Sequence, residues 1–254
     1  MKKADYRESH TEKGKGKVYH ESFVTYPYRK YMWEWEQSVL SEILRSKVNR
    51  DSPILDFACG TGRILNFLIT ISDKVTGVDV SDSMLEVSSG NHPDLELVKA
   101  DLTKDNVFLG KRQFPLIITF RFFLNAQNSL RVEVLDALYP LLEDNGIFIF
   151  NNHGNATGIG TLLGKLVVSI KNIFRNSNSQ FTYYLLSHSK IKTLLKDSGF
   201  EITETHHRSV VPILNEKTKF DVSKIDKIEN WFSSKSFFRP FARSVIYVCK
   251  KKNP

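Results

Sequence analysis

The segment ILDFACGTGRIL, residues 54–65, is the most informative stretch of the chain. A short apolar strand ends in Asp56, and Ala58, Gly60 and Gly62 then permit a tight turn before a helix begins. The backbone of such a turn can approach a ligand closely, and the first turn of the helix presents unpaired N–H groups to it. The segment therefore predicts a nucleotide-binding turn.

Spacing separates the ligand classes that use this kind of turn. A phosphate-binding loop has the pattern G-x-x-x-x-G-K-S/T, which is absent from the chain. A dinucleotide-binding fold has a third glycine in G-x-G-x-x-G, and this chain has Leu65 at that position. The nicotinamide interpretation is weakened accordingly.

The residues around the turn alternate short apolar runs with helical segments, which is typical of a doubly wound α/β sheet. Strands are predicted at 54–57, 74–78, 95–98, 116–120 and 147–150, with helices at 63–70, from 82 onwards and at 129–142. Val132, Leu135, Leu138 and Leu142 form the apolar face of the last helix, and Asn145-Gly146 is expected to close it.

The flanking segments complete a single predicted domain over 18–254. Residues 1–17 are rich in Lys, Gly and Glu and predict a mobile arm. The assignments are an N-terminal lid at 18–50 with a helix at 28–47, a cofactor-binding core at 54–150, and substrate-side helices with an insertion at 156–240. Further elements are expected at 158–175 and 189–197 (helices) and at 200–205 and 244–249 (strands), and the insertion at 209–240 carries five aromatics including Phe220.

Composition and charge limit the class of protein. The chain has 254 residues, 41% apolar and 25% charged, which indicates a globular domain. Cys59 and Cys249 lie far apart and support neither a disulfide framework nor a zinc site. No apolar run reaches the ~18 to 20 residues of a membrane span, and no secretory signal is apparent, so a cytoplasmic location is expected.

The net charge of +8 is unevenly distributed. Residues 145–196 contain no Asp or Glu, while Lys165, Lys171, Arg175, Lys190, Lys192 and Lys196 provide six positive charges. Either an anionic partner or a merely solvated basic face explains this pattern.

Two further motifs follow the turn at regular intervals. The segment VTGVDVS ends a strand in Asp79, and VKADLTK contains Asp101 followed by Leu102. Together with Asp56, Gly60 and Gly62, which match D-x-x-x-G-x-G, these residues make the chain similar to the class I S-adenosylmethionine-dependent methyltransferases. The resemblance extends through LSHSKIKTLLKDSGFEITET at 186–205 and SVIYVCKK at 244–251, and FRFFLNA with NNHGN is similar to bacterial members.

The resemblance implies a Rossmann-like sheet of seven strands, mostly parallel with an antiparallel seventh strand, helices on both faces, and S-adenosylmethionine as cofactor. Asp79 is then expected to accept the ribose hydroxyls, Asp101 and Leu102 to meet the adenine, and Met84 to pack on the adenine ring. The full set of implied cofactor residues is Asp56, Ala58, Gly60, Thr61, Gly62, Asp79, Val80, Met84, Asp101, Leu102 and Phe120.

The segments after the fourth and fifth strands are candidates for the acceptor side. Arg121 could bind an anionic substrate group or pair with a nearby acid, and both interpretations stay open. His153 is either a general base or a structural histidine. Tyr28 and His207 are further candidate substrate residues, with Tyr19 and Tyr26 as candidates to close over the cofactor.

The same segments argue against two kinds of chemistry. The resemblance associates metal-dependent members with acids after strands four and five, where this chain has Phe120-Arg121 and Asn151-Asn152. No metal is therefore expected. The Asn or Asp, Pro, Pro, aromatic tetrapeptide of amino-methylating members is also absent.

These observations favour a methyltransferase that acts on a hydroxyl of a small-molecule or glycan acceptor. The acceptor could carry an anionic or a lipid-linked group. The alternatives are an RNA or other nucleic-acid methyltransferase and a non-catalytic cofactor-binding module. The apolar face of 158–175 is expected to pack over the site in preference to a membrane surface.

Overall fold

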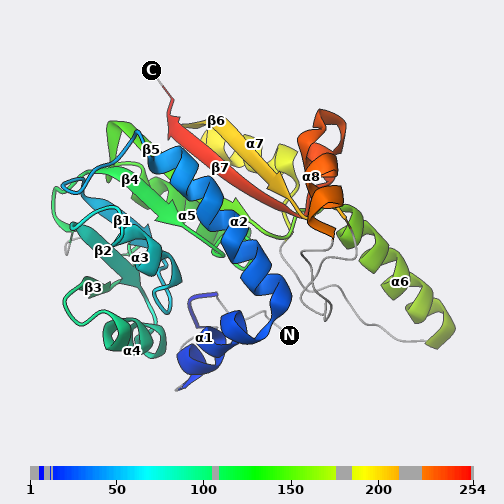
Figure 1. The fold of residues 1–254 in the computed structure, drawn as a ribbon, viewed down its shortest axis with the longest axis horizontal. Helices are drawn as coiled ribbons and strands as arrows, with labels where there is room; N and C mark the ends of the chain where they lie inside the picture. Colours follow the sequence, from blue (N-terminus) through cyan, green and yellow to red (C-terminus); the bar gives the residue numbers. More distant parts are fainter. Residues whose placement is uncertain are drawn as a thin grey trace.

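The computed structural model describes residues 6–8, 12, 14–104, 109–175, 185–211 and 225–252, which form one seven-stranded sheet with helices on both sides (Figure 1). The strands are β1 (Ile54–Phe57), β2 (Val75–Asp79), β3 (Glu96–Lys99), β4 (Phe114–Thr119), β5 (Leu142–Asn152), β6 (Phe200–Arg208) and β7 (Ser244–Lys251). The α-helices are α1 (Lys15–Thr25), α2 (Pro27–Leu44), α3 (Arg63–Leu68), α4 (Asp82–Asn91), α5 (Asn128–Leu138), α6 (Ile159–Arg175), α7 (His188–Asp197) and α8 (Asp226–Ser234), with 3-10 turns η1 (Tyr6–Glu8) and η4 (Ser236–Phe241).

The sheet has the order β3-β2-β1-β4-β5-β7-β6. The pairs among β1 to β5 are parallel, and β7 lies antiparallel between β5 and β6. The predicted fold class is therefore confirmed. Because the strand order reverses between β1 and β4, the carboxyl ends of these two strands flank the crevice in which such sheets bind ligands.

The two faces of the sheet bury separate cores. On one face, Leu40 and Leu44 of α2 and Leu65 of α3 pack against strand residues such as Ile54 and Ile118. On the other face, α5 and α7 cover the alternate strand positions, among them Leu55, Ile117, Phe148 and Tyr247. Successive side chains of a strand point to opposite faces, so every central strand is apolar on both sides.

The boundary between α5 and β5 differs from the prediction. The helix ends at Leu138, and Leu142 already belongs to β5, as do Asn145 and Gly146. The register of β5 against β4 shifts here, because Phe114 pairs with Leu142 but Leu116 pairs with Ile147. The Asn-Gly signal therefore marks an irregularity within the strand, and the exposed Val132, at 42% exposure, is not on the buried face of α5.

The N-terminal helix packs against α4. The Gly16 N–H donates to Ser83 Oγ over 3.1 Å, and a Cβ atom on Gly16 would lie 2.1 Å from the Ser83 carbonyl oxygen. The sequence predicts an ordered chain from residue 18 onwards, but α1 begins at Lys15 and Tyr6–Glu8 forms a helical turn. The mobility of residues 1–17 stays a prediction.

Helix α6 extends away from the sheet (Figure 1). Four of its apolar side chains, Leu162, Leu163, Leu166 and Val167, are 47–56% exposed. The expectation that this apolar face packs over the site is wrong for these four residues, because none of them lines the cavity described below. The predicted aromatic Phe220 lies outside the described residues.

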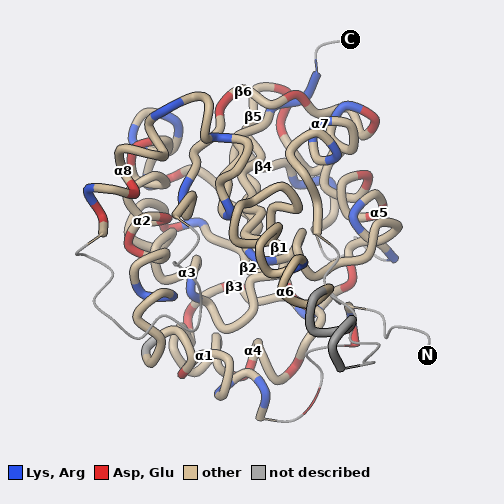
Figure 2. The backbone as a smooth tube through the Cα atoms, turned by 90° about the vertical axis from the view of Figure 1, so that its right-hand side faces the viewer, with Lys and Arg blue, Asp and Glu red and all other residues tan. Residues whose placement is uncertain are grey.

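Charged residues of both signs are spread over the surface helices and loops (Figure 2). Lys165, Lys190, Lys192 and Lys196 from the acid-free stretch are all exposed. In the described part of the chain, no helix combines the length and apolarity needed to cross a bilayer.

Candidate active site

A cavity opens at the carboxyl ends of β1, β2 and β4, where the strand order predicts a ligand. Its walls come from the turn after β1, the ends of β2 and β3, the loop after β4, helix α5 and the N-terminal segment. The lining residues are Tyr6, Arg7, Tyr19, Phe57, Ala58, Gly60, Asp79, Val80, Met84, Ala100, Asp101, Phe120, Arg121, Phe122, Leu130 and Val134.

The turn after β1 presents its backbone to the cavity. Ala58, Gly60 and Gly62 all adopt left-handed conformations, with φ of 56°, 57° and 84°. The Gly60 N–H donates to Asp79 Oδ2 over 2.8 Å, and the Ser81 N–H donates to Asp79 Oδ1 over 2.9 Å. A Cβ atom on Gly60 would meet nothing within 4 Å, so the turn leaves open space beside the Asp79 carboxylate.

Asp56 is a buried carboxyl with unusual surroundings. It is 1% exposed, and neither carboxylate oxygen has a hydrogen-bond partner among the described residues. Burial raises the pKa of Asp56 well above its usual value, and the charges of Arg63 and Asp79 act in opposite directions on it. An orphaned carboxylate below a ligand-binding turn matches a cationic group on the ligand.

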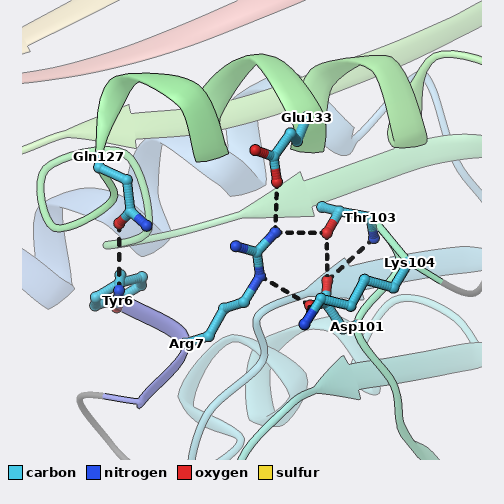
Figure 3. Close-up of polar contacts among 7 residues, drawn as sticks. All are labelled: Tyr6, Arg7, Asp101, Thr103, Lys104, Gln127 and Glu133. Carbon is cyan, nitrogen blue, oxygen red and sulfur yellow. Dashed lines mark hydrogen bonds and ion pairs between the residues drawn. The ribbon is translucent and has the colours of Figure 1, made fainter. Parts of the chain in front are cut away.

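The N-terminal turn contributes Tyr6 and Arg7 to one wall of the cavity. Figure 3 shows the polar contacts that hold these two residues. Arg7 Nε lies 2.8 Å from Asp101 Oδ2, and Arg7 Nη2 donates to Thr103 Oγ1 over 2.6 Å and to Glu133 Oε2 over 2.5 Å. The Tyr6 N–H donates to Gln127 Oε1 over 3.2 Å. Tyr6 and Arg7 are thus fixed to α5 with its N-cap residue Gln127 and to the segment after β3.

The Asp101 carboxylate is already engaged in this arrangement. Its Oδ1 accepts the Thr103 N–H over 3.1 Å and the Thr103 hydroxyl over 2.6 Å. Burial would raise the pKa of Asp101, but these hydrogen bonds and the positive charges of Arg7 and Lys104 outweigh it and lower the pKa. Asp101 therefore remains ionised in the folded protein near neutral pH.

Helix α1 brings two aromatic residues to the same region. Tyr19 lines the cavity, and its ring lies edge-on to Phe23 at 5.2 Å between centroids. Three guanidinium groups surround the Phe23 ring, with Arg29, Arg63 and Arg121 at 5.0, 4.9 and 4.8 Å from its centroid. We call these three arginines and Phe23 the arginine cluster.

Arg121 is held in a strained backbone conformation, with φ of 65°. Its N–H donates to Asn151 Oδ1 over 2.6 Å, and its carbonyl accepts from Asn125 Nδ2 over 2.8 Å. Asn151 Nδ2 in turn donates to Glu36 Oε1 over 2.8 Å. Non-glycine residues in this conformation cost about 1–2 kcal/mol and concentrate at functional sites, and here the network holds the Arg121 backbone in it.

The arginine cluster carries more positive than negative charge. Glu36 Oε2 pairs with Arg63 Nη1 over 2.7 Å, whereas Arg121 has no acidic partner among the described residues and its Nε is buried without a hydrogen bond. The guanidinium carbons of Arg63 and Arg121 are at most about 10 Å apart, since each lies within 5 Å of one ring centroid. Two such charges repel by at least about 1.7 kcal/mol at an effective dielectric constant of about 20.

His153 lies beside the cluster and does not line the cavity. Burial lowers the pKa of His153 well below its usual value, and the charges of Arg121, Arg243, Arg63 and Arg29 lower it further. Its Nδ1 is buried and has no hydrogen-bond partner among the described residues. The imidazole is therefore neutral near pH 7.

The structure brings most of the expected cofactor residues together. Those that line the cavity are Ala58, Gly60, Asp79, Val80, Met84, Asp101 and Phe120, and the candidate substrate residue Arg121 lines it as well. Asp56, Thr61 and Leu102 lie buried behind the wall, as the spacing of a strand and turn requires, and Gly62 continues the turn into α3. Of the candidate lid tyrosines, Tyr19 lines the cavity and Tyr26 is 46% exposed.

Two candidate substrate residues lie elsewhere. The Tyr28 hydroxyl is 3.0 Å from Ser209 Oγ in a small separate core. His207 bonds the Arg239 carbonyl through Nδ1 at 3.1 Å and Thr205 Oγ1 through Nε2 at 3.0 Å, and burial, with nearby positive charge, lowers its pKa to about 4. Neither residue lines the cavity.

Sequence reasoning missed other cavity residues, namely Tyr6, Arg7, Phe57, Ala100, Phe122, Leu130 and Val134. The aromatic and aliphatic members could have been found from their positions next to predicted strand ends. Nothing in the polar segment around Tyr6 and Arg7 signals contacts with residues more than 120 positions later. Within the described ranges, no three His, Cys, Asp or Glu side chains lie together as a metal ion would require.

Comparison with known proteins identifies the core of the chain. Residues 54–146 match a family model described as a methyltransferase domain. A protein from Geobacillus sp. (strain WCH70) is 28% identical over 53% of this chain and 57% of its own length, and YqeM from Bacillus subtilis (strain 168) is 29% identical over 56% and 55%. Both carry methyltransferase names, and the matches span only about half the length of each relative.

The fold extends the similarity beyond the matched core. The magnesium protoporphyrin IX methyltransferase of Synechocystis PCC 6803, solved with bound S-adenosylhomocysteine, superposes with a TM-score of 0.61 over 89% of this chain and 86% of that one, at 14% identity. This similarity covers the seven-stranded sheet, including β6 and β7, which lie outside the matched residues 54–146. Residues 54–146 therefore match a methyltransferase domain, and the described chain has the fold of the S-adenosylmethionine-dependent methyltransferases.

Proposed function

We propose that the chain binds S-adenosylmethionine in the cavity and transfers its methyl group to a hydroxyl of a small-molecule or glycan acceptor. The observation that carries the proposal is the junction of Gly60 and Asp79, where a left-handed turn meets a strand-end carboxylate beside open space. The methyltransferase family match and the Synechocystis structure, which contains the demethylated cofactor, support the same ligand.

The residues present fit this cofactor. The Asp79 carboxylate accepts the N–H groups of Gly60 and Ser81, and its two oxygens together keep acceptor capacity for the ribose hydroxyls. Met84 and Phe122 provide apolar walls for the adenine, next to Asp101. Burial favours the protonated form of the orphaned Asp56 carboxyl, and a cofactor with ammonium and sulfonium charges bound nearby would favour its ionised form.

The bound cofactor would supply an electrophilic methyl group on a sulfonium. The remaining catalysis is positioning and the exclusion of water, for which the cavity offers the apolar side chains of Phe57, Phe122, Leu130 and Val134. We propose His153, whose imidazole is neutral near pH 7, as the acceptor of the hydroxyl proton. His153 lies behind the cavity wall beside Arg121, so an anionic acceptor near Arg121 would favour its protonation.

Calorimetric titration of the protein with S-adenosylmethionine, run beside NADH, tests the proposal. We expect saturable binding of S-adenosylmethionine alone. Asp79→Ala should raise its dissociation constant at least about 100-fold, since two hydrogen bonds to a charged group are lost. Asp73→Ala, which removes an exposed carboxylate paired with Arg50, is the matched control and should leave the affinity unchanged.

Two results would contradict this proposal. One is binding of NADH in place of S-adenosylmethionine, and the other is an unchanged affinity in Asp79→Ala. Turnover is followed by release of S-adenosylhomocysteine with a panel of hydroxylated acids and sugars. His153→Ala should lower this rate more than it lowers cofactor affinity.

A further inference from the structure

The arginine cluster has features that the cofactor does not account for. Arg121 lies directly after β4, and Asn151 at the end of β5 holds its backbone. In sheets of this topology, the segments after these strands border the ligand crevice. Arg121 also lines the cavity, whereas Phe23 and the other two arginines lie behind it. The cluster thus adjoins the cofactor cavity on the side where an acceptor would approach.

The construction of the cluster indicates a binding role for Arg121 in addition to packing. Arginines held close to one another repel unless an anion separates them, and within the cluster Glu36 pairs with Arg63 and not with Arg121. Glu36 is itself 1% exposed and divided between Arg63 and Asn151, so it is not available to Arg121. The Arg121 backbone is strained and its Nε is buried without a partner.

Each of these features has a cost to the folded protein, and an anionic ligand would offset all of them. A guanidinium presents its N–H groups as a planar fork that matches the two oxygens of a carboxylate or phosphate. The ring of Phe23 supports this fork, because the Arg121 guanidinium carbon lies 4.8 Å from the ring centroid. The cluster therefore offers a pre-formed site for an oxyanion.

We propose that the arginine cluster binds an anionic group, carboxylate or phosphate, of the methyl acceptor, with Arg121 as the direct contact. This inference rests on the proposed function and narrows it to acceptors that carry a negative charge. Arg29 and Arg63 raise the local positive potential, and Asn151, itself bound to Glu36, holds the Arg121 backbone at the edge of the cavity. Arg121 is then a residue that determines specificity, and it has no part in cofactor binding.

The test uses inorganic phosphate and acetate as probes, each at constant ionic strength balanced with chloride. The melting temperature of the protein saturated with S-adenosylmethionine should rise and saturate with at least one of the two anions. A larger effect of phosphate indicates a phosphorylated acceptor, and a larger effect of acetate indicates a carboxylic acid. No saturable rise with either anion would overturn the inference.

Variants assign the anion to the cluster. Arg121→Gln should raise the apparent dissociation constant of the anion at least tenfold, and Arg121→Lys, which keeps the charge but loses the fork, should raise it less. Arg29→Gln should weaken binding about threefold without touching the strained residue. Arg50→Gln is the control, because it removes an exposed cation that precedes β1, at the end of the strand away from the cavity. Equal losses in Arg50→Gln and Arg121→Gln, or no loss in Arg121→Gln, would overturn the inference.

Calorimetry with S-adenosylmethionine on the same samples separates the two proposals. Retained cofactor affinity in Arg121→Gln is expected. If the wild-type protein binds S-adenosylmethionine but neither anion, only the assignment of an anionic methyl acceptor to the arginine cluster is overturned. Anion binding in a protein that ignores S-adenosylmethionine contradicts the proposed function and leaves the cluster an anion site without a methyl acceptor.

Discussion

At the scale of single residues, Asp56 is a group of the site whose burial lowers the stability of the folded protein. Its carboxyl is buried without a hydrogen-bond partner among the described residues, and burial raises its pKa well above the usual value. The folded state therefore binds this proton more tightly than the unfolded state. The stability contributed by the protonated carboxyl is fully present below the unfolded pKa of about 3.9 and is lost as pH rises through the folded pKa.

Asp56→Asn should remove this pH dependence. We expect the free energy of unfolding of the variant, relative to wild type, to increase between pH 4 and pH 7, with a slope of at most about 1.4 kcal/mol per pH unit. Urea denaturation across this range measures it. A difference that stays constant with pH would show that the Asp56 carboxyl titrates normally in the folded protein.

Gly60 and Gly62 form a matched pair with different roles. A Cβ atom on Gly62 would lie 2.7 Å from Ser88 Oγ, whereas one on Gly60 would enter open space at the cavity. Both residues are left-handed, so each alanine variant carries about 1–2 kcal/mol of strain. Gly62→Ala should lose about 2–4 kcal/mol of stability, because steric overlap adds to the strain.

Gly60→Ala should instead lose cofactor affinity. Its stability falls only by the strain, but the new methyl group lies where the ligand approaches the backbone, so the dissociation constant for S-adenosylmethionine should rise at least tenfold. Calorimetry and denaturation of both variants test the pair. A larger loss of affinity in Gly62→Ala than in Gly60→Ala would be inconsistent with the arrangement of the turn.

At the scale of elements, α1 joins the cofactor cavity to the arginine cluster through Tyr19 and Phe23. Its position depends on Gly16, because a Cβ atom there would lie 2.1 Å from a backbone oxygen of α4 that cannot move aside alone. Gly16→Ala should therefore displace α1 and leave the sheet intact. In this variant we expect the backbone amides of α1, but not those of the strands, to lose protection from hydrogen exchange. Lys17→Ala, at an exposed neighbour, is the control, and protected α1 amides in Gly16→Ala would refute this account.

The elements differ in how far the sequence predicts them. The strand β1, the turn and α3 are determined locally by an apolar run and three small residues, so residues 54–65 could be interpreted in isolation. The junction between α5 and β5 was misplaced because an Asn-Gly pair occurs in bulges as well as at helix ends. The roles of Arg7, Phe23 and Glu36 could not be predicted, since each depends on contacts between elements distant in sequence.

At the scale of the whole molecule, the N-terminal turn connects two walls of the cavity, namely the segment after β3 and helix α5. Arg7 is 18% exposed and contacts Asp101, Thr103 and Glu133, whereas Lys104 is 72% exposed and lies 3.6 Å from the same Asp101 carboxylate. Arg7→Ala should raise the dissociation constant for S-adenosylmethionine about 5- to 10-fold, chiefly through faster dissociation. Lys104→Ala is the matched control and should change it less than twofold, because exposed ion pairs contribute little. Stopped-flow dissociation rates measure both, and equal effects would deny the turn its role.

The contacts of Tyr6 and Arg7 also impose an order on the formation of the protein. Their partners Gln127 and Glu133 follow 121 and 126 positions later, so during synthesis the two residues wait for more than a hundred others. Closing so long a loop is entropically costly, and it becomes favourable only after α5 has packed on the sheet. The N-terminal turn is therefore synthesised first but takes its place in the cavity wall late. Ligand binding should accordingly appear after the sheet has folded.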